Sequence, residues 1–513
     1  MILRSKFLGM EGEKPIVILN KEDAEELDVR PLDRVELIHG KRRGTAIVNI
    51  ASRFIKKGEI GLYVEISEHM KTGTGDKLEV LTSSPPESLI HIREKLRGKT
   101  LDDSAIRKII EDTIDRKLSE IEMTAFVTAL YNHGMTTGEV ASLSKAMTFT
   151  GKTLDIGKKE VYDKHSIGGV PGDETSMILV PTVAAAGLTI PKTSSRAITS
   201  PAGTADRFES LAPVDLELEE IKRVVKKTNG CLVWGGAVDL APADDMFIKI
   251  EYPLSIDPLL LPSVMSKKRA VGAKYLVIDI PTGEGAKVKT TKEAELLAER
   301  FISLGKKLGI KTVGASTFGE QPLGKCVGPA LEAKEAMEIL MNGKGASDQI
   351  DKVTTLAGIL FDYKMKTGGK KKALDLIKSG KSYRKMKEII EAQGGNPRIK
   401  PGDIPIGPKK AEIKSNVDGK VWWIDNSAVV EVSRAAGTPK NKGAGMVIHK
   451  KVGDSVKKGD TLLEIYAEKG YKLERALKIA KESKVVGVGK KFEMLLEKIP
   501  SRKESPKYFI LER

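Results

Sequence analysis

A segment rich in glycine and hydroxyl side chains, residues 163–176 (DKHSIGGVPGDETS), has the composition of an anion-binding loop. Glycine lets backbone N–H groups come close to phosphate oxygens, because it has no side chain and accepts positive φ angles. Lys164 adds a positive charge, and Ser166 and Ser176 add hydroxyl donors. A glycine-rich turn is also typical of a plain strand-to-helix connection, so this segment alone decides nothing.

Three later segments strengthen the prediction of an anion site. Residues 191–206 (PKTSSRAITSPAGTAD) again combine hydroxyls with cations, residues 234–244 (WGGAVDLAPAD) follow, and residues 262–268 (PSVMSKK) open a helix-like stretch. In open α/β sheets, ligands bind where the carboxyl ends of neighbouring strands meet. We therefore expect the first two loops to converge on one site.

These four segments, in this order, resemble the motifs of the thymidine/pyrimidine nucleoside phosphorylase superfamily, over roughly residues 90–500. Pro171 in the glycine loop, the run 195–200 and an additional N-terminal domain are similar to its archaeal AMP-using branch, the AMP phosphorylases. The resemblance implies phosphorolysis of nucleoside 5′-monophosphates, with AMP and inorganic phosphate giving adenine and ribose 1,5-bisphosphate in nucleotide salvage or degradation. It also implies a homo-oligomer, at least a dimer, that needs no cofactor and no metal.

The family motif places the contacts to inorganic phosphate on a defined set of residues. These are Lys164, Ser166, Ser176, Ser194 and Thr204. His165 follows Lys164 within the motif, and two interpretations stay open for it: a donor near the sugar, or a structural histidine.

The segment that follows the LAPAD motif departs from the pyrimidine enzymes. Counted without gaps, the position of their base-reading arginine falls on Glu251, so that arginine is absent here. Asp257 resembles the proton donor of the AMP phosphorylases, since a carboxyl that stays protonated near pH 7 can deliver a proton to N7 of adenine. The alternative is a turn aspartate before Pro258. The loop from Asp257 to Ser263 is shorter than in pyrimidine enzymes, which leaves its register open.

A nucleotide carries a 5′-phosphate that a nucleoside lacks, so a second group of donors is expected. The predicted nucleotide-binding residues are Gly169, Ser195, Arg196, Ala197, Ile198, Thr199, Ser200, Thr204, Ser263 and Lys287. Two of them have a plainer alternative: Lys287 as a solvated loop lysine, and Ser263 as the N-cap of a helix.

Composition narrows the class of protein. The formal net charge is +16, but aromatic residues make up only 5% and the densest lysine runs lie outside the motif loops, so we expect no nucleic-acid partner. Cys231 and Cys326 are the only cysteines, which excludes a disulfide scaffold and a four-cysteine zinc site. No apolar run approaches the roughly 20 residues that span a bilayer. These observations predict a cytoplasmic protein without a membrane partner.

The 513 residues are too many for one hydrophobic core and divide by pattern into five parts. We expect an α/β fold with a helical subdomain. β-type runs at 15–19, 34–38 and 45–50 predict a small N-terminal β barrel over 1–82. Amphipathic stretches such as 103–114, capped by Asp103 or Ser104, predict a helical subdomain over 88–160. A parallel α/β domain at 161–340, a helical and linker region at 341–414 and a C-terminal α+β domain at 415–513, similar to half of a lipoyl-type sandwich, complete the prediction.

Three other functions remain open on sequence grounds. One is a thymidine or pyrimidine nucleoside phosphorylase. Another is a phosphoribosyltransferase on the related fold, which would need magnesium and a pyrophosphate loop. The third is a basic nucleic-acid protein without enzymatic activity, which would explain the charge but not four ordered motifs.

Overall fold

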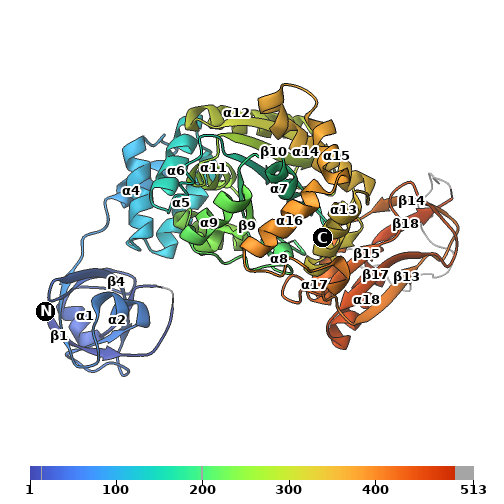
Figure 1. Cartoon of the computed structure of the whole chain (residues 1–513). Helices are drawn as coiled ribbons and strands as arrows, with labels where there is room; N and C mark the ends of the chain where they lie inside the picture. The colour runs from blue at the N-terminus through green and yellow to red at the C-terminus, as the bar shows by residue number, and fades with distance from the viewer. Residues whose placement is uncertain (13, 198–199, 491–513) are drawn as a thin grey trace, which may run out of the picture.

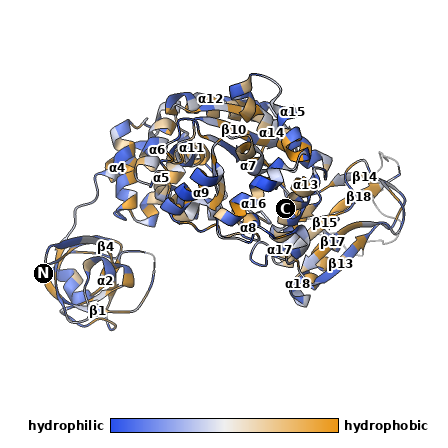
Figure 2. Cartoon of the chain, in the orientation of Figure 1, coloured by the Kyte–Doolittle hydropathy of each residue, from blue (hydrophilic) through white to orange (hydrophobic). Residues whose placement is uncertain are grey.

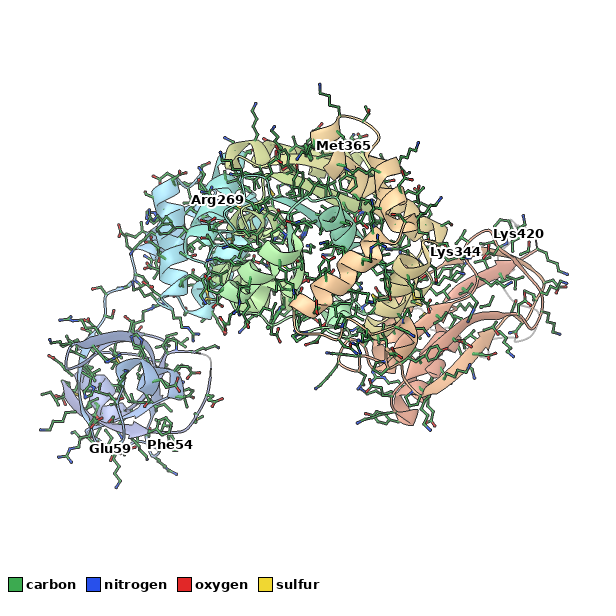
Figure 3. The ribbon with its side chains drawn as sticks, viewed as in Figure 1. Phe54, Glu59, Arg269, Lys344, Met365 and Lys420 are labelled. Atoms are coloured by element: carbon green, nitrogen blue, oxygen red, sulfur yellow. The ribbon has the colours of Figure 1, made fainter. Side chains whose placement is uncertain are left out.

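The computed structural model describes residues 1–12, 14–197 and 200–490. Figure 1 shows a small barrel at the N-terminal end, a large central body, and a C-terminal domain on the opposite side. Phe54 and Glu59 on the barrel and Lys420 on the C-terminal domain lie at opposite ends of the molecule (Figure 3). Among the described residues, no helix is long and apolar enough to cross a membrane.

The N-terminal unit is a closed β barrel, as predicted. Its strands are β1 (Ile2–Phe7), β2 (Ile16–Asn20), β3 (Arg34–His39), β4 (Arg42–Ala51), β5 (Glu59–Leu62) and β6 (Lys77–Thr82), in the order β1-β5-β2-β4-β3-β6. Alternating residues such as Val35 and Leu37 fill the interior, and the short helices α1 (Lys21–Glu26) and α2 (Val64–Met70) pack on it. Arg34 ties the barrel to the next unit, because its Nε donates to the carbonyl of Lys117 at 2.5 Å.

The helical subdomain contains α3 (Ser88–Leu96), α4 (Asp103–Ile114), α5 (Glu120–His133) and α6 (Thr137–Phe149). The predicted helix at 103–114 is confirmed, but both predicted caps are wrong by one or two positions: Asp102 is the N-cap, and its Oδ1 accepts from the Ala105 amide at 2.8 Å. Two helices from further along the chain, α10 (Pro242–Leu254) and α11 (Leu260–Ala270), pack against α5 and α6.

The central sheet is parallel throughout. Strands β7 (Tyr162–Ser166), β10 (Tyr275–Thr282) and β11 (Lys311–Phe318) form one part, in the order β11-β10-β7. Strands β8 (Ile190–Ser194) and β9 (Gly230–Trp234) form the other, and a parallel bridge between Val161 and Thr189 joins β7 to β8 at their starts. All five strands therefore end at the same edge, and the loops that follow them meet there, as the sequence predicted.

Helices enclose the sheet and bury one large core. They are α7 (Thr175–Ala185), α8 (Thr204–Phe208), α9 (Leu218–Thr228), α12 (Thr291–Leu308), α13 (Pro329–Asn342), α14 (Ser347–Met365), α15 (Gly369–Lys378) and α16 (Lys381–Ala392), with 3-10 turns at Gly235–Val238 and Pro401–Asp403. Phe361 and Ile389 share a core cluster with Val180 of α7. Helices α14 to α16, which lie in the helical and linker region predicted for 341–414, thus share a core with the α/β part of the chain.

The C-terminal domain combines two small sheets with α17 (Asn426–Ala436) and α18 (Gly470–Glu482). Its strands are β13 (Lys409–Lys414), β14 (Gly419–Ile424), β15 (Gly445–Ile448), β16 (Ser455–Val456), β17 (Thr461–Ala467) and β18 (Val486–Gly489). The larger sheet has the order β12-β15-β17-β13, so it includes β12 (Cys326–Val327) from the α/β part of the chain. Hydrophobic residues, orange in Figure 2, run along both of its sheets and through the central body.

Candidate active site

The predicted phosphate-binding residues stand at the carboxyl edge of the sheet or at the helix starts beside it. Lys164 and Ser166 lie at the end of β7, Ser194 ends β8, Ser176 is the second residue of α7, and Thr204 opens α8. A helix N-terminus presents unpaired N–H groups, which favours an anion near Ser176. The fold therefore brings these side chains to one edge.

Gly169 places the glycine loop directly against the loop that carries Lys287. Its φ angle is +98°, and a Cβ there would lie 2.6 Å from the backbone nitrogen of Lys287. Any side chain at Gly169 would force these two loops apart. Two members of the predicted nucleotide set, far apart in sequence, are thus neighbours.

A buried aspartate links three of the four sequence motifs. Asp163, which is completely buried, accepts from Lys268 at 2.7 Å, and the ammonium of Lys192 lies 4.0 Å from its other oxygen. Burial lowers the pKa of Lys192 well below its ordinary value, and the positive charge of Lys268 lowers it further. Two lysine side chains therefore share one aspartate at this end of the site, and Lys192 is driven towards its neutral form.

Lys164 joins a second buried ion-pair network. Its ammonium lies 3.3 Å from a carboxylate oxygen of Asp279, and Lys352 lies 3.0 Å from the same oxygen and 3.1 Å from Asp173. Burial opposes ionisation of Asp173, but Lys352 and Lys164 lower its pKa overall. Asp173, at the end of the glycine loop, is thereby held as a carboxylate that fixes the loop before α7.

His165 faces the cationic groups from the end of β7. Loss of solvent lowers its pKa well below the ordinary value, and Lys268 and Lys192 lower it further. The imidazole is therefore neutral near pH 7, so it offers one donor and one acceptor. This property suits either of the two interpretations left open by the sequence.

The loop after β8 is held in shape by carboxylates. Asp206 accepts from the amides of Ala197 at 2.7 Å and Gly203 at 2.8 Å, and the hydroxyl of Ser200 donates to the Ala202 carbonyl at 3.3 Å. Ser195 is exposed, whereas Ile198 and Thr199 lie outside the described residues.

Arg196 is already bound by acidic groups of its own chain. Its guanidinium makes two hydrogen bonds to Glu209, at 2.7 and 2.8 Å, lies 3.2 Å from Asp215, and stacks 5.0 Å from the ring of Trp234. The paired charge lowers the pKa of Glu209 to about 2. The predicted contact between Arg196 and a nucleotide stays a prediction, and it would have to compete with these carboxylates.

The third and fourth motifs meet through Asp244, in the first turn of α10. Its Oδ2 accepts from the hydroxyl of Ser263 at 2.8 Å and lies 2.6 Å from the ammonium of Lys267. Burial opposes the charge on Lys267, but Asp244 raises its pKa overall. Helix α11 begins at Leu260, so the alternative of Ser263 as an N-cap is wrong and its hydroxyl is fixed by Asp244 instead.

Asp257 lies in the turn between α10 and α11, at the open side of the site. The residue is exposed, yet the protein beside it removes enough water to raise the pKa of the carboxyl; Lys287 opposes this rise and Asp244 adds to it. The effect of Lys287 on this pKa means that its charge lies near Asp257. Because the carboxyl is only partly covered, a ligand bound over it would raise its pKa further.

Glu251 supports the turn that carries Asp257. It is 6% exposed, and its Oε1 accepts from the Leu259 amide at 3.0 Å. Burial raises its pKa to about 8, and Asp257 and Asp244 contribute. The position of the pyrimidine-reading arginine is therefore taken by a carboxyl that keeps its proton near pH 7.

The sequence prediction missed several groups of this site. They are Asp163, Lys192, Asp244, Glu251, Lys267, Lys268, Asp279 and Lys352. Most lie inside the quoted motifs, where charged side chains flank the hydroxyls. Their signal was therefore present, but the pairing between motifs required the fold.

Similarity to known families agrees with this arrangement. Residues 158–383 match the model of the glycosyl transferase family a/b domain, and residues 91–151 match the helical bundle domain of the same family. Residues 421–486 match the pyrimidine nucleoside phosphorylase C-terminal domain.

Three archaeal relatives extend the similarity over nearly the whole chain. The AMP phosphorylase of Thermofilum pendens is 45% identical, and the match covers 100% of both chains. Those of Thermococcus kodakarensis and Pyrococcus horikoshii are 48% and 50% identical, over 95% and 94% of this chain and 98% and 96% of theirs. This chain belongs to the AMP phosphorylase family.

The family fold extends to more distant enzymes. Anthranilate phosphoribosyltransferase from Thermus thermophilus matches 59% of this chain and 99% of its own, with a TM-score of 0.51 at 18% identity. At this identity the likeness shows a shared fold only. It gives no support to the phosphoribosyltransferase alternative as an activity, and membership of the AMP phosphorylase family is independent of it.

Proposed function

We propose that the protein catalyses phosphorolysis of AMP, which yields adenine and ribose 1,5-bisphosphate. One observation carries the proposal: Lys287 is exposed, its backbone nitrogen and Cγ lie against Gly169 of the anion-type loop, and its charge opposes the rise in the pKa of the nearby Asp257. A positive charge, a phosphate-type loop and a carboxyl with a raised pKa therefore lie near one another. The names of the relatives support AMP as the substrate.

Inorganic phosphate would bind at the strand edge, through Lys164, Ser166, Ser176, Ser194 and Thr204. Lys192 and Lys268 share one aspartate at this end, and an entering dianion would favour their charged forms. From there a phosphate oxygen attacks C1′ of the ribose while the bond to the base breaks. The preorganised cationic groups stabilise the negative charge of the nucleophile's phosphate throughout.

The nucleotide's own phosphate would bind to Lys287 and to the loop 195–200. Among the described residues, the ammonium of Lys287 forms no ion pair, so its charge is available to a ligand. Arg196, in contrast, is paired with Glu209 and Asp215. In this proposal Lys287 supplies the charge and the loop supplies N–H and hydroxyl donors.

Asp257 would protonate the leaving adenine at N7. Its pKa is raised by partial desolvation, and a base stacked over the carboxyl would exclude more water. Ser263 and Lys267, fixed by Asp244, border the same space and would orient the sugar and base. The oligomer and the cytoplasmic location expected from the sequence stay predictions.

A substrate panel tests the proposal. AMP, CMP, UMP, adenosine and thymidine are each incubated with phosphate, and free base is measured. We expect phosphate-dependent release of adenine from AMP to be fastest. Faster consumption of thymidine than of AMP would contradict it, and base release that requires magnesium and pyrophosphate would favour the phosphoribosyltransferase alternative.

A further inference from the structure

The loop that carries Lys287 depends on groups outside itself for its shape. Residues 283–288 follow β10 and contain glycine at 283 and 285. Only two internal hydrogen bonds are found among the described residues of this loop: Gly283 to the Val288 carbonyl at 3.0 Å, and Ala286 to the Gly283 carbonyl at 2.9 Å. A loop so rich in glycine loses much entropy on ordering, so it needs an external support.

Glu320 gives part of that support by accepting from the Glu284 amide at 3.2 Å, and a further part comes from Asn426, the first residue of α17 in the C-terminal domain. Asn426 is 1% exposed, and its Nδ2 donates to the carbonyl of Gly319 at 2.9 Å. Gly285 lies directly on the same side chain, because a Cβ at 285 would be 2.5 Å from Asn426 Nδ2. The carboxamide of one domain thus contacts the backbone of the lysine loop in the other.

Gly319 in turn contacts Thr282, just before the loop, and Ala286 within it. Its amide donates to the Thr282 carbonyl at 2.9 Å, and a Cβ at 319 would lie 3.0 Å from the Cβ of Ala286. Ala286 immediately precedes Lys287, whose backbone nitrogen lies against Gly169. A continuous set of close contacts therefore runs from Asn426 to the glycine loop.

We propose that Asn426 is a positioning residue for substrate binding: its carboxamide fixes the loop 283–288, so that Lys287 meets the substrate's own phosphate. This inference rests on the proposed function, in which Lys287 holds that phosphate. It gives the C-terminal domain an indirect part, through Lys287, in recognition of a nucleotide over a nucleoside.

The chemistry of Asn426 favours a positioning part over simple packing. Its Oδ1 is buried and, within the described part of the chain, has no hydrogen-bond partner. An unsatisfied buried acceptor lowers stability, and an apolar side chain of similar size would avoid that cost. The amide is therefore explained by what its N–H group does for Gly319 and the loop.

Asn426→Ala tests this inference by its effect on two substrates. We expect the KM for AMP to rise about tenfold, the loss expected when a hydrogen bond to a charged group is misplaced, while the KM for inorganic phosphate changes less than about twofold. The double variant Asn426→Ala/Lys287→Ala should bind AMP no more weakly than Lys287→Ala alone, because Asn426 acts only through Lys287.

Asp425→Ala is the matched control. Asp425 caps α17 by accepting from the amides of Ser427 at 2.8 Å and Ala428 at 3.1 Å, and it is not the residue that contacts the lysine loop. Loss of this cap should lower the melting temperature but leave the KM for AMP unchanged. If Asn426→Ala fails to fold, Gly285→Ala replaces it: its added methyl group would meet Asn426 Nδ2, so this variant should raise the KM for AMP and spare that for inorganic phosphate, and an unchanged KM for AMP would overturn the inference.

Each outcome decides the question. An unchanged KM for AMP in folded Asn426→Ala would overturn the inference while leaving the proposed function intact. The same would follow if the rise in KM for AMP in the double variant equalled the product of the rises in the two single variants. Wild-type protein that releases no base from AMP would instead overturn the proposed function, and this inference with it.

Discussion

The two ends of the candidate site differ in the kind of ionisable group that they gather. At the strand edge, Lys192 and Lys268 share one close carboxylate, Asp163. Between α10 and α11, Asp244 pairs with Lys267, but Glu251 and Asp257 add two further carboxyls. The first end therefore gathers lysines around one aspartate, and the second gathers three carboxyls near Lys267 and Lys287.

At both ends a pKa is shifted so that the neutral form is favoured, downwards at the first end and upwards at the second. Burial and like charges push the pKa of Lys192 down and the pKa of Glu251 up, so each group is driven towards its neutral form. An anion completes the first end, since it would favour the charged forms of the lysines there. A group that accepts a proton completes the second. The comparison thus predicts which substrate part belongs at which end.

Removal of the proton donor should have the largest effect. Asp257→Asn keeps the shape of the side chain but cannot give up a proton, so kcat for AMP should fall about 10²- to 10⁴-fold with little change in KM. Steady-state kinetics of adenine release measures it. Near-normal turnover would reduce Asp257 to the turn residue of the alternative interpretation.

Two lysine variants should separate the anion sites. Lys164→Ala should raise the KM for inorganic phosphate about 10- to 100-fold and spare that for AMP, because a charged hydrogen bond is lost only from the nucleophile. Lys287→Ala should instead raise the KM for AMP and spare that for inorganic phosphate. Because adenosine lacks the 5′-phosphate, this variant should also reduce the preference for AMP over adenosine. Equal losses for both substrates in both variants would mean one undivided site.

Glu251 should make stability depend on pH. Its folded pKa, about 8, lies above the usual value of 4.5, so the folded state holds a proton that the unfolded state releases, and stability falls as pH rises from 4.5 to 8. Glu251→Gln imitates the protonated form. Above pH 8 its free energy of unfolding should exceed that of the wild type by up to about a few kcal/mol, and its melting temperature should be higher. Near pH 4.5 the two proteins should be equally stable.

Glu209→Gln is the control for this pH dependence. Hydrogen bonds from Arg196 lower the pKa of Glu209 to about 2, so its contribution is present above the unfolded pKa and is lost as pH falls through 2. This variant should therefore be less stable than the wild type at neutral pH. If Glu251→Gln also proved less stable than the wild type above pH 8, the prediction that Glu251 holds a proton in the folded state would be wrong.

Arg196 should give the smallest effect. Its ion pairs are partly exposed, so Arg196→Lys should cost at most about 1 kcal/mol of stability. If Arg196 only shapes its loop, the KM values for AMP and adenosine should rise by the same small factor. A rise for AMP alone would place its guanidinium on the nucleotide's phosphate, as the sequence predicted.

The sequence predicted what local pattern determines. The barrel strands at 15–19, 34–38 and 45–50, the helix at 103–114 and the convergence of two loops follow from alternation, amphipathic periodicity and strand direction, and all are found. Contacts between segments distant in the sequence were not predictable. Asp244 lies 19 residues from Ser263 and Asp163 lies 105 from Lys268, so neither pair leaves a local signal. Ser263 was misplaced as a possible cap because hydrophobic Leu260, without a polar cap, begins the helix.

Strand β12 sets a limit on how this protein can be divided. Its two residues, Cys326 and Val327, are encoded within the α/β part of the chain but pair with Val447 and Met446 of the C-terminal sheet. A chain cut near residue 408 would leave β12 without its partner and expose an unpaired strand edge of the kind that promotes aggregation. Exchange of C-terminal domains between relatives would likewise have to carry residues 326–327 along, so the unit that recombines is discontinuous in sequence.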